Sequence, residues 1–318
     1  MRALLVVNPK ATTTSERSRD ILVRALRSEV DLRVEYTRRR GHAVDLARSA
    51  AQLGVDVVVT LGGDGTVNEA VNGLMQALPT ALPDGLPWTP AERLPALAVV
   101  PGGSTNVFAR AVGLPKDWAE GTGAILESLR VGRFRTIGLG RADDRYFTFC
   151  AGFGLDAAVI RRVERARRRG RVSTSALYLR STVGQYFLDT DRRHPSITLE
   201  RPGEPGISAL ATVIIQNTAP WTFLGDRALS PNPEASFDLG LDLMAIRALH
   251  VPSTTRTVTQ ILSARSGPRG RQILRLHDVD EFTLLASRPE AFQLDGDYLG
   301  EREKVRFTSV TRALRVIC

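Results

Sequence analysis

The chain is organised around residues 55–73, which read Val55-Asp56-Val57-Val58-Val59-Thr60-Leu61-Gly62-Gly63-Asp64-Gly65-Thr66-Val67-Asn68-Glu69-Ala70-Val71-Asn72-Gly73. An apolar run rich in β-branched residues opens the segment and predicts a buried parallel strand. Three glycines in four positions follow, with one aspartate between them. Ala70, Val71 and Leu74 then recur at helical spacing. The segment therefore predicts a strand, a glycine turn and the start of a helix.

The glycine turn has the properties of an anion-binding site. Glycines let the backbone approach a phosphate, and the N–H groups at a helix start point toward it. A carboxylate beside phosphates is repelled unless a cation lies between them, so we interpret Asp64 as facing Mg²⁺ through water. The alternative is a purely structural turn in which Asp64 serves as an N-cap. The Lys-bearing phosphate loop does not fit, because no Lys follows.

A second glycine turn follows the apolar strand predicted at residues 97–100. It reads Pro101-Gly102-Gly103-Ser104-Thr105-Asn106-Val107-Phe108-Ala109-Arg110. Strands and helices alternate through about residue 130, which predicts an α/β domain with a parallel sheet. From Arg135 onward the predicted strands are short and helices are sparse, which predicts an antiparallel β domain. Near the end, Asp295-Gly296 interrupts an apolar strand and is a hairpin signal.

These motifs resemble the diacylglycerol kinase catalytic-domain family, which includes bacterial lipid kinases and sphingosine kinases. Gly62 to Thr66 with Asn68-Glu69 is similar to the family's nucleotide loop, although its five-residue core also occurs in NAD kinases. Residues 101–110 are similar to a second family motif that NAD kinases lack, and Asp295-Gly296-Asp297 is similar to a third, Asp-Gly-Glu.

The resemblance implies a fold. It consists of an NAD kinase/phosphofructokinase-like α/β nucleotide domain at 1–133, an antiparallel β-sandwich lipid domain at 134–302, and a tail at 303–318 that packs back on the first domain.

The resemblance also implies an ATP- and Mg²⁺-dependent lipid kinase, which by family default converts diacylglycerol to phosphatidic acid in phospholipid biosynthesis. Asp295, or Asp297 beside it, takes the proton of the lipid hydroxyl. Asp64 and Asp238 are the implied metal ligands. The implied nucleotide-binding residues are Asn8, Thr37, Gly62, Gly63, Asp64, Gly65, Thr66, Val67, Asn68, Glu69, Gly103, Ser104 and Asn106.

Three positions depart from the family pattern. Val107 replaces an Asp near the metal, Leu239 interrupts a pair of acids around a structural Mg²⁺, and Asp297 replaces a Glu. Two alternatives therefore stay open: a soluble-substrate kinase of the NAD kinase type, and a catalytically inactive lipid-binding homologue.

The amino-acid composition limits which binding partners and which cellular compartment are expected. The net charge of +9 comes almost wholly from arginine, since only three lysines occur among 43 basic residues. A basic protein is drawn to nucleic acid or to anionic membrane, and no nucleic-acid motif is present, so we expect a membrane surface and no nucleic acid. No secretory signal or transmembrane run is found, and two cysteines make no disulfide framework. We expect a cytoplasmic protein, peripheral on the inner face of the membrane, and leave a homodimer open.

Three further segments invite interpretation. Residues 161–171 hold seven arginines and one Glu, which indicates either a solvated helix end or a contact with anionic lipid. Residues 175–188 predict a helix whose apolar side chains pack in the core or line a lipid pocket. Five prolines at 79–95 predict a surface loop without regular structure, with Trp88 either at a membrane interface or in a plain loop.

Overall fold

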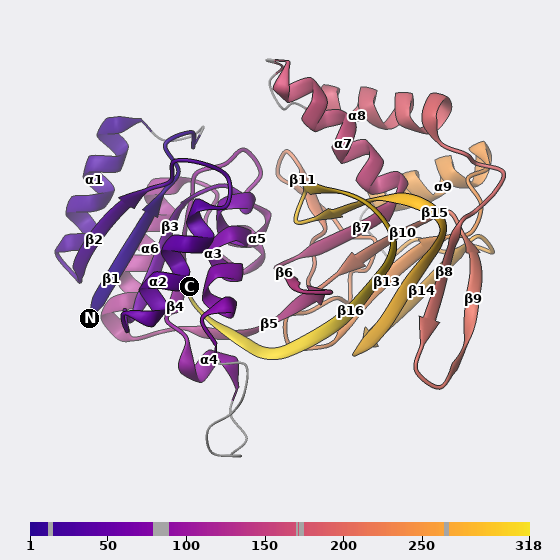
Figure 1. Cartoon of the computed structure of the whole chain (residues 1–318). Helices are drawn as coiled ribbons and strands as arrows, with labels where there is room; N and C mark the ends of the chain where they lie inside the picture. The colour runs from indigo at the N-terminus through magenta and orange to yellow at the C-terminus, as the bar shows by residue number, and fades with distance from the viewer. Residues whose placement is uncertain (12–14, 79–88, 170, 172–174, 264–266) are drawn as a thin grey trace. The chain divides into compact units, whose positions relative to one another are not determined.

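The computed structural model describes residues 1–11, 15–78, 89–169, 171, 175–263 and 267–318 (Figure 1). The chain divides into two compact units. The first contains Met1–Leu139 together with Val310–Cys318, and the second contains Gly140–Ser309. The domain boundaries expected from the sequence, at 133/134 and 302/303, stay a prediction.

The first unit is built on a parallel sheet, as predicted. Each strand pairs in parallel with its neighbour, and every residue of the two strands that carry the glycine turns is buried, which explains their continuous apolar sequences. The strands in sheet order are β4 (Ala96–Pro101), β3 (Val57–Gly62), β1 (Arg2–Val7) and β2 (Asp31–Tyr36).

Helices alternate with these strands: α1 (Glu16–Arg27), α2 (His42–Gln52), α3 (Asp64–Gln76), α4 (Pro90–Arg93), α5 (Val107–Ala111) and α6 (Trp118–Val131). The helices α2 and α3 cross at Gly73, where a Cβ atom would lie 2.3 Å from the carbonyl oxygen of Val44. Glycine at this position therefore sets how closely the two helices approach.

The prediction that residues 79–95 lack regular structure is wrong at the short helix α4. Pro90 lies at its N-terminus, where a fixed φ favours the helix and the missing N–H costs nothing. Glu92 accepts a hydrogen bond from the backbone N–H of Thr89 at 3.0 Å, which closes the first turn. Residues 79–88, including Trp88, lie outside the described residues.

The second unit consists mainly of antiparallel strands, which confirms the predicted fold class. The short strands are β5 (Arg135–Ala142), which enters from the first unit, β6 (Arg145–Phe147), β7 (Cys150–Gly154), β8 (Ile197–Arg201), β9 (Glu204–Leu210), β10 (Thr212–Gln216), β11 (Thr222–Leu224), β12 (Arg227–Leu229), β13 (Leu241–Ile246) and β14 (Ile273–Val279). Two long strands follow, β15 (Glu281–Leu294) and β16 (Asp297–Ile317).

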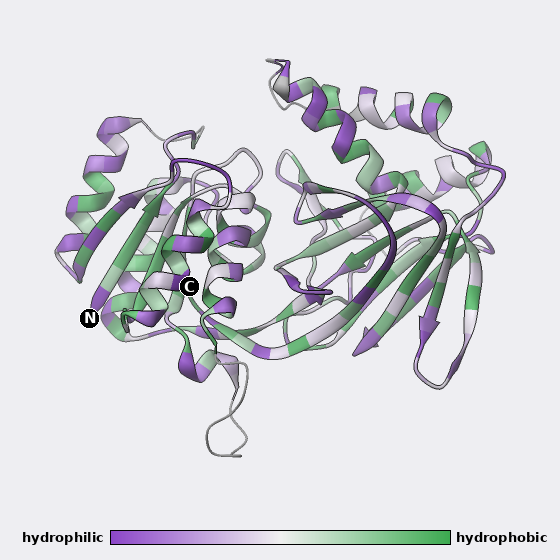
Figure 2. Ribbon diagram, viewed as in Figure 1, coloured by the Kyte–Doolittle hydropathy of each residue, from purple (hydrophilic) through white to green (hydrophobic). Residues whose placement is uncertain are grey.

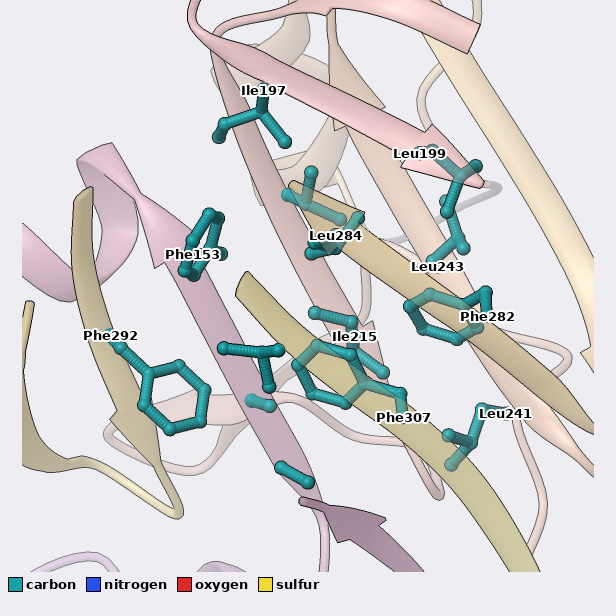
Figure 3. Close-up of a cluster of buried hydrophobic side chains, with 14 of the residues drawn as sticks. Phe153, Ile197, Leu199, Ile215, Leu241, Leu243, Phe282, Leu284, Phe292 and Phe307 are labelled. Atoms are coloured by element: carbon teal, nitrogen blue, oxygen red, sulfur yellow. The ribbon is translucent and has the colours of Figure 1, made fainter. Parts of the chain in front are cut away.

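Phenylalanines form the centre of the second unit's core (Figure 3). The rings of Phe282 and Phe307 stack with centroids 5.0 Å apart, and Phe292 meets Phe307 edge to face at 6.3 Å. These side chains come from β15 and β16, so the long hairpin supplies the core as well as the sheet pairing.

The end of β16 returns to the first unit, as predicted for the tail. There Val316 and Ile317 pair in parallel with Leu97 and Ala98 of β4. The final strand is thus shared in sequence between the two units, while each unit keeps its own core.

The helices of the second unit are α7 (Leu155–Arg168), α8 (Ser175–Gly184) with a π-helical extension η1 (Gln185–Asp189), and α9 (Val251–Ser263). The expectation that the apolar side chains of 175–188 pack in the core holds for Leu177 and Tyr186, which are buried. It is wrong for Val183 and Phe187, which are exposed. None of the helices in the described part of the chain is long and apolar enough to cross a membrane.

Candidate functional site

The predicted nucleotide residues of the first unit gather at the carboxyl ends of its four parallel strands. Thr37 follows β2, Asn8 follows β1, and the two glycine turns follow β3 and β4. Ligands of open α/β sheets bind outside this edge, because the loops and helix N-termini meet there. The amide of Asn8 donates to Oγ1 of Thr66 at 3.1 Å, and the N–H of Thr37 donates to the carbonyl of Val7.

The two glycine turns touch each other through their backbones. A Cβ atom on Gly103 would lie 2.7 Å from Cα of Gly63, and one on Gly62 would lie 2.5 Å from Oγ1 of Thr66. The N–H of Gly102 donates to the carbonyl of Gly62 at 2.9 Å. Side chains are therefore excluded from Gly62 and Gly103, and the surface between the turns is made of backbone.

Asp64 joins the first turn to the second. Its carboxylate oxygens accept hydrogen bonds from the backbone N–H groups of Val107 and Phe108, each at 3.0 Å. These are the first two residues of α5, whose own N-cap, Asn106, is left-handed and makes no side-chain cap. Asp64 thus caps a helix that begins 43 residues later in the chain.

Other predicted residues of the turns also shape the site. The side chain of Asn106 forms two 2.8 Å hydrogen bonds with the backbone of Gly103, which fixes the second turn. Glu69 accepts N–H bonds from Gly41 and Ala43 and so caps the start of α2. Val67 and Asn68 are buried, whereas the Ser104 hydroxyl lies on an exposed residue beside the turns.

The arrangement fits a phosphate group. The N-cap of α3 is Gly63, which has no side chain to occupy the first N–H groups of the helix. The two glycine turns pack closely beside this helix start, because a Cβ atom on Gly62 or Gly103 would clash with Thr66 or Gly63. Within the described residues, no three His, Cys, Asp or Glu side chains gather so as to hold a metal ion. A Mg²⁺ ion near Asp64 would therefore take most of its ligands from phosphate and water.

Asp295 occupies a different kind of site, in the second unit. It forms with Gly296 a two-residue turn between β15 and β16, in which both residues have positive φ. Its buried carboxylate accepts four hydrogen bonds, at 2.7 to 3.1 Å: one from the Thr148 hydroxyl and three from the backbone N–H groups of Thr148, Phe149 and Cys150. These hydrogen bonds hold the Asp295 carboxylate in one fixed orientation.

The other predicted acids lie apart from this cluster of bonds. Asp297 is half-buried and faces Leu294 across the hairpin. Asp238 is exposed in a turn before β13, where its N–H donates to Oγ of Ser236 at 3.3 Å.

A comparison with known protein families assigns the N-terminal part of the chain. The model of the diacylglycerol kinase catalytic domain matches residues 2–142, which contain both glycine turns. Residues 2–142 belong to the diacylglycerol kinase catalytic-domain family.

Relatives in this diacylglycerol kinase family match over different lengths. The "Diacylglycerol kinase" of Bacillus subtilis is 28% identical over 268 residues, which are 82% of this chain and 77% of that protein. The "Probable lipid kinase YegS-like" of Chromohalobacter salexigens is 35% identical over 155 residues, which are 49% of this chain and only 44% of that protein. A crystal structure of a diacylglycerol kinase from Bacillus anthracis str. Sterne has a TM-score of 0.70 at 18% identity and covers 99% of this chain and 96% of that one, which shows a common fold.

Two departures from the diacylglycerol kinase pattern have visible structural consequences. The side chain of Val107 is buried, while its backbone N–H is the one that Asp64 holds. Leu239 is exposed beside Asp238, in a turn closed by a hydrogen bond from the N–H of Leu239 to the carbonyl of Ser236. Neither side chain supplies an oxygen ligand, so any metal at these places would depend on other groups.

Sequence reasoning did not select Asp156, which the structure places beside the Asp295 turn. Its carboxylate accepts a 2.9 Å hydrogen bond from Gln293, and Gln293 in turn accepts one from the N–H of Gly296. Burial raises the pKa of the Asp156 carboxyl group to about 6, although the Gln293 bond acts in the opposite direction. The available signal was its place in Gly152-Phe153-Gly154-Leu155-Asp156, a glycine-rich strand end that opens a helix.

Proposed function

We propose that the protein is an ATP- and Mg²⁺-dependent lipid kinase that phosphorylates a lipid hydroxyl, with diacylglycerol as substrate and phosphatidic acid as product. The observation that carries the proposal is the pair of glycine turns, packed backbone to backbone at the ends of adjacent parallel strands in a domain of this family. A surface of backbone N–H groups without side chains suits the phosphates of a nucleotide.

In this proposal the first unit binds and orients the phosphates. The N–H groups at the start of α3 and the hydroxyl of Ser104 donate to phosphate oxygens. Asp64 keeps the second turn in place through α5 and faces Mg²⁺ through water, while Asn8, Thr37, Asn68, Glu69 and Asn106 position the surrounding backbone or contact the nucleotide. Bound ATP and Mg²⁺ supply the phosphoryl group and neutralise its charge.

The second unit supplies the proton acceptor. Asp295 is preferred over Asp297 because one of its four donors is the rotatable Thr148 hydroxyl, at 2.9 Å. A lipid hydroxyl can replace that donor at the same carboxylate oxygen, while the three backbone N–H groups keep the carboxylate in place. The lipid oxygen then gives its proton to Asp295 as it bonds to the terminal phosphorus of ATP, while the bond from that phosphorus to ADP breaks and ADP leaves.

Three substitutions test the assignment of Asp295 as the proton acceptor. Asp295→Asn lowers kcat by roughly 10²–10⁴ without loss of the fold. Thr148→Val removes only the competing hydroxyl and keeps activity within about a factor of ten, because no proton passes through it. Asp297→Asn is the matched control in the same turn. A large loss of kcat in Asp297→Asn, with Asp295→Asn active, moves the acceptor to Asp297.

Transfer of labelled phosphate from ATP·Mg²⁺ to a panel of lipids in mixed micelles tests the function itself. We expect a labelled phosphatidic acid that disappears with Asp64→Ala and with Asp295→Asn. A labelled product from NAD without micelles would replace the proposal by a soluble-substrate kinase. Absence of any product, from folded protein that still binds lipid, would replace it by an inactive lipid-binding homologue.

A lipid substrate places the protein at a membrane, and we propose a peripheral position on the inner face, with residues 161–171 in contact with anionic lipid. Arg161 pairs with Glu301 at 2.7 Å and Arg162 pairs with Asp189, so these two arginines hold neighbouring structure together. Arg165, Arg167, Arg169 and Arg171 are exposed and are the ones that would face lipid. Residue 170 and the side chain of Arg168 lie outside the described part of the chain.

A further inference from the structure

The helix formed by α8 and η1 exposes a set of apolar side chains. Val183, Phe187 and Leu188 are exposed, with 48%, 53% and 75% of their surface accessible. On the opposite side, Ser181 and Gln185 are buried. A surface helix of a soluble domain normally turns its apolar side chains inward. We call Val183, Phe187 and Leu188 the α8 ridge.

The inward side of this helix is held by specific contacts, so the exposure of the ridge is built into the unit. The hydroxyl of Tyr186 donates to the carbonyl of Leu249 at 2.7 Å, and the Tyr186 ring belongs to a buried cluster with Met244 and Ile214. The amide of Gln185 donates to Oγ1 of Thr190 at 3.4 Å. Rotating the ridge inward would break the Tyr186 contacts.

The ridge lies in the most basic part of the chain. Between residues 161 and 193 there are ten arginines and three acidic residues, a net charge of +7 out of +9 for all 318 residues. Arg180 is exposed one turn before Val183, and Arg192 lies with its guanidinium 5.4 Å from the Phe187 ring centroid. Figure 1 shows α7 beside α8, and Figure 2 shows hydrophilic bands along α7.

We propose that the α8 ridge inserts into the interface of an anionic membrane, with Arg165, Arg167, Arg180 and Arg193 contacting lipid head groups. Apolar side chains flanked by cationic ones suit the boundary between acyl chains and negatively charged head groups. A nucleic acid or an acidic protein would attract the arginines, but it offers no apolar layer for Phe187 and Leu188. The inference deepens the proposed function and rests on it only for the membrane as partner.

Sedimentation with vesicles tests the proposal on the full chain without nucleotide. The vesicles contain phosphatidylglycerol and phosphatidylcholine in equal parts. The double variant Phe187→Ser/Leu188→Ser is expected to bind at least about tenfold more weakly than the parent, because two large apolar side chains no longer leave water. The matched control is Ile21→Ser/Leu53→Ser, two similarly exposed apolar residues of the first unit, and it is expected to bind like the parent.

A second variant reports insertion directly. Tryptophan emission of Phe187→Trp is expected to shift to shorter wavelength on anionic vesicles and to stay unchanged with phosphatidylcholine alone. Equal vesicle binding by the Phe187→Ser/Leu188→Ser variant, an equal loss in the control, or an unshifted Phe187→Trp emission on anionic vesicles overturns the proposal.

Activity on a short-chain diacylglycerol dissolved as monomers separates docking from catalysis. The ridge variant is expected to keep this activity while losing activity on vesicles. If the parent binds vesicles through the ridge but phosphorylates no lipid, the docking surface stands and the proposed kinase function fails.

Discussion

Asp64 connects the chemistry of the candidate site to its stability. Both of its oxygens hold N–H groups at the start of α5, so Asp64→Ala is expected to lower the free energy of unfolding by about 1–2 kcal/mol. Asp64→Asn keeps one acceptor and is expected to cost less. Urea denaturation measures both. If Asp64 served only a metal, both variants would unfold like the parent and lose activity alone.

Asp156 gives the molecule a pH dependence of known sign. The pKa of its carboxyl group is raised from 3.8 to about 6 in the folded state. A raised carboxyl pKa means that the folded state binds the proton more tightly, so stability falls as the pH rises from about 4 to about 6. Asp156→Asn removes this loss. We expect it to stabilise the protein by up to about 3 kcal/mol above pH 6 and to change little near pH 4.

Urea denaturation at the two pH values measures the difference for Asp156→Asn. Asp297→Asn is the control, since it changes a half-buried acid in the neighbouring hairpin. A gain in stability that is equal at both pH values would assign the effect to packing and not to the charge.

Residue types in the site could be predicted from the sequence, but the bonds they make could not. Glycine, aspartate and asparagine at strand ends predict a tight turn, and such a turn before a helix start is able to bind an anion. The partners of Asp64 lie 43 and 44 residues away, and those of Asp295 lie 145 to 147 residues away. Such contacts arise from sheet order and register, and local pattern carries no information about them.

At the level of elements, the helices α2 and α3 can cross closely because Gly73 has no Cβ atom. Gly73→Ala would place Cβ 2.3 Å from a backbone oxygen of Val44, so the helices must separate. We expect a loss of about 1–3 kcal/mol in the free energy of unfolding, measured by urea denaturation. Gly123→Ala is the matched control in α6, where the new Cβ meets no atom within 4 Å. It is expected to stabilise by about 0.5–1 kcal/mol, because alanine favours the helix.

Elements were predictable where one signal dominated, and less so where two competed. The apolar runs before both glycine turns predicted buried parallel strands correctly, because their sequences carry no competing helix or turn signal. At 90–93 the proline count argued against structure, while the position of Pro90 at a helix start favoured it. Within 175–188 the apolar spacing predicted a helix, but it could not show that Ser181 and Gln185 would be buried and Phe187 exposed.

For the whole molecule, β16 offers a test of how far the two units are independent. Val305 and Val316 are fully buried on this one strand, the first in the core of the second unit and the other in the first unit beside β4. Val→Ala removes the same two methyl groups at either place, with an expected cost of about 1–3 kcal/mol. If each unit has its own cooperative core, the cost stays local.

Native-state hydrogen exchange measures where that cost falls. Val316→Ala is expected to lower the protection of amides in β1, β3 and β4 and to leave β10 and β13 unchanged, whereas Val305→Ala is expected to do the reverse. Equal losses throughout the chain in both variants would show one cooperative structure. The nucleotide turns would then share their stability with the Asp295 hairpin, and a lipid contact in the second unit would change the first. Local losses would mean that each part of the candidate site is stabilised by its own unit.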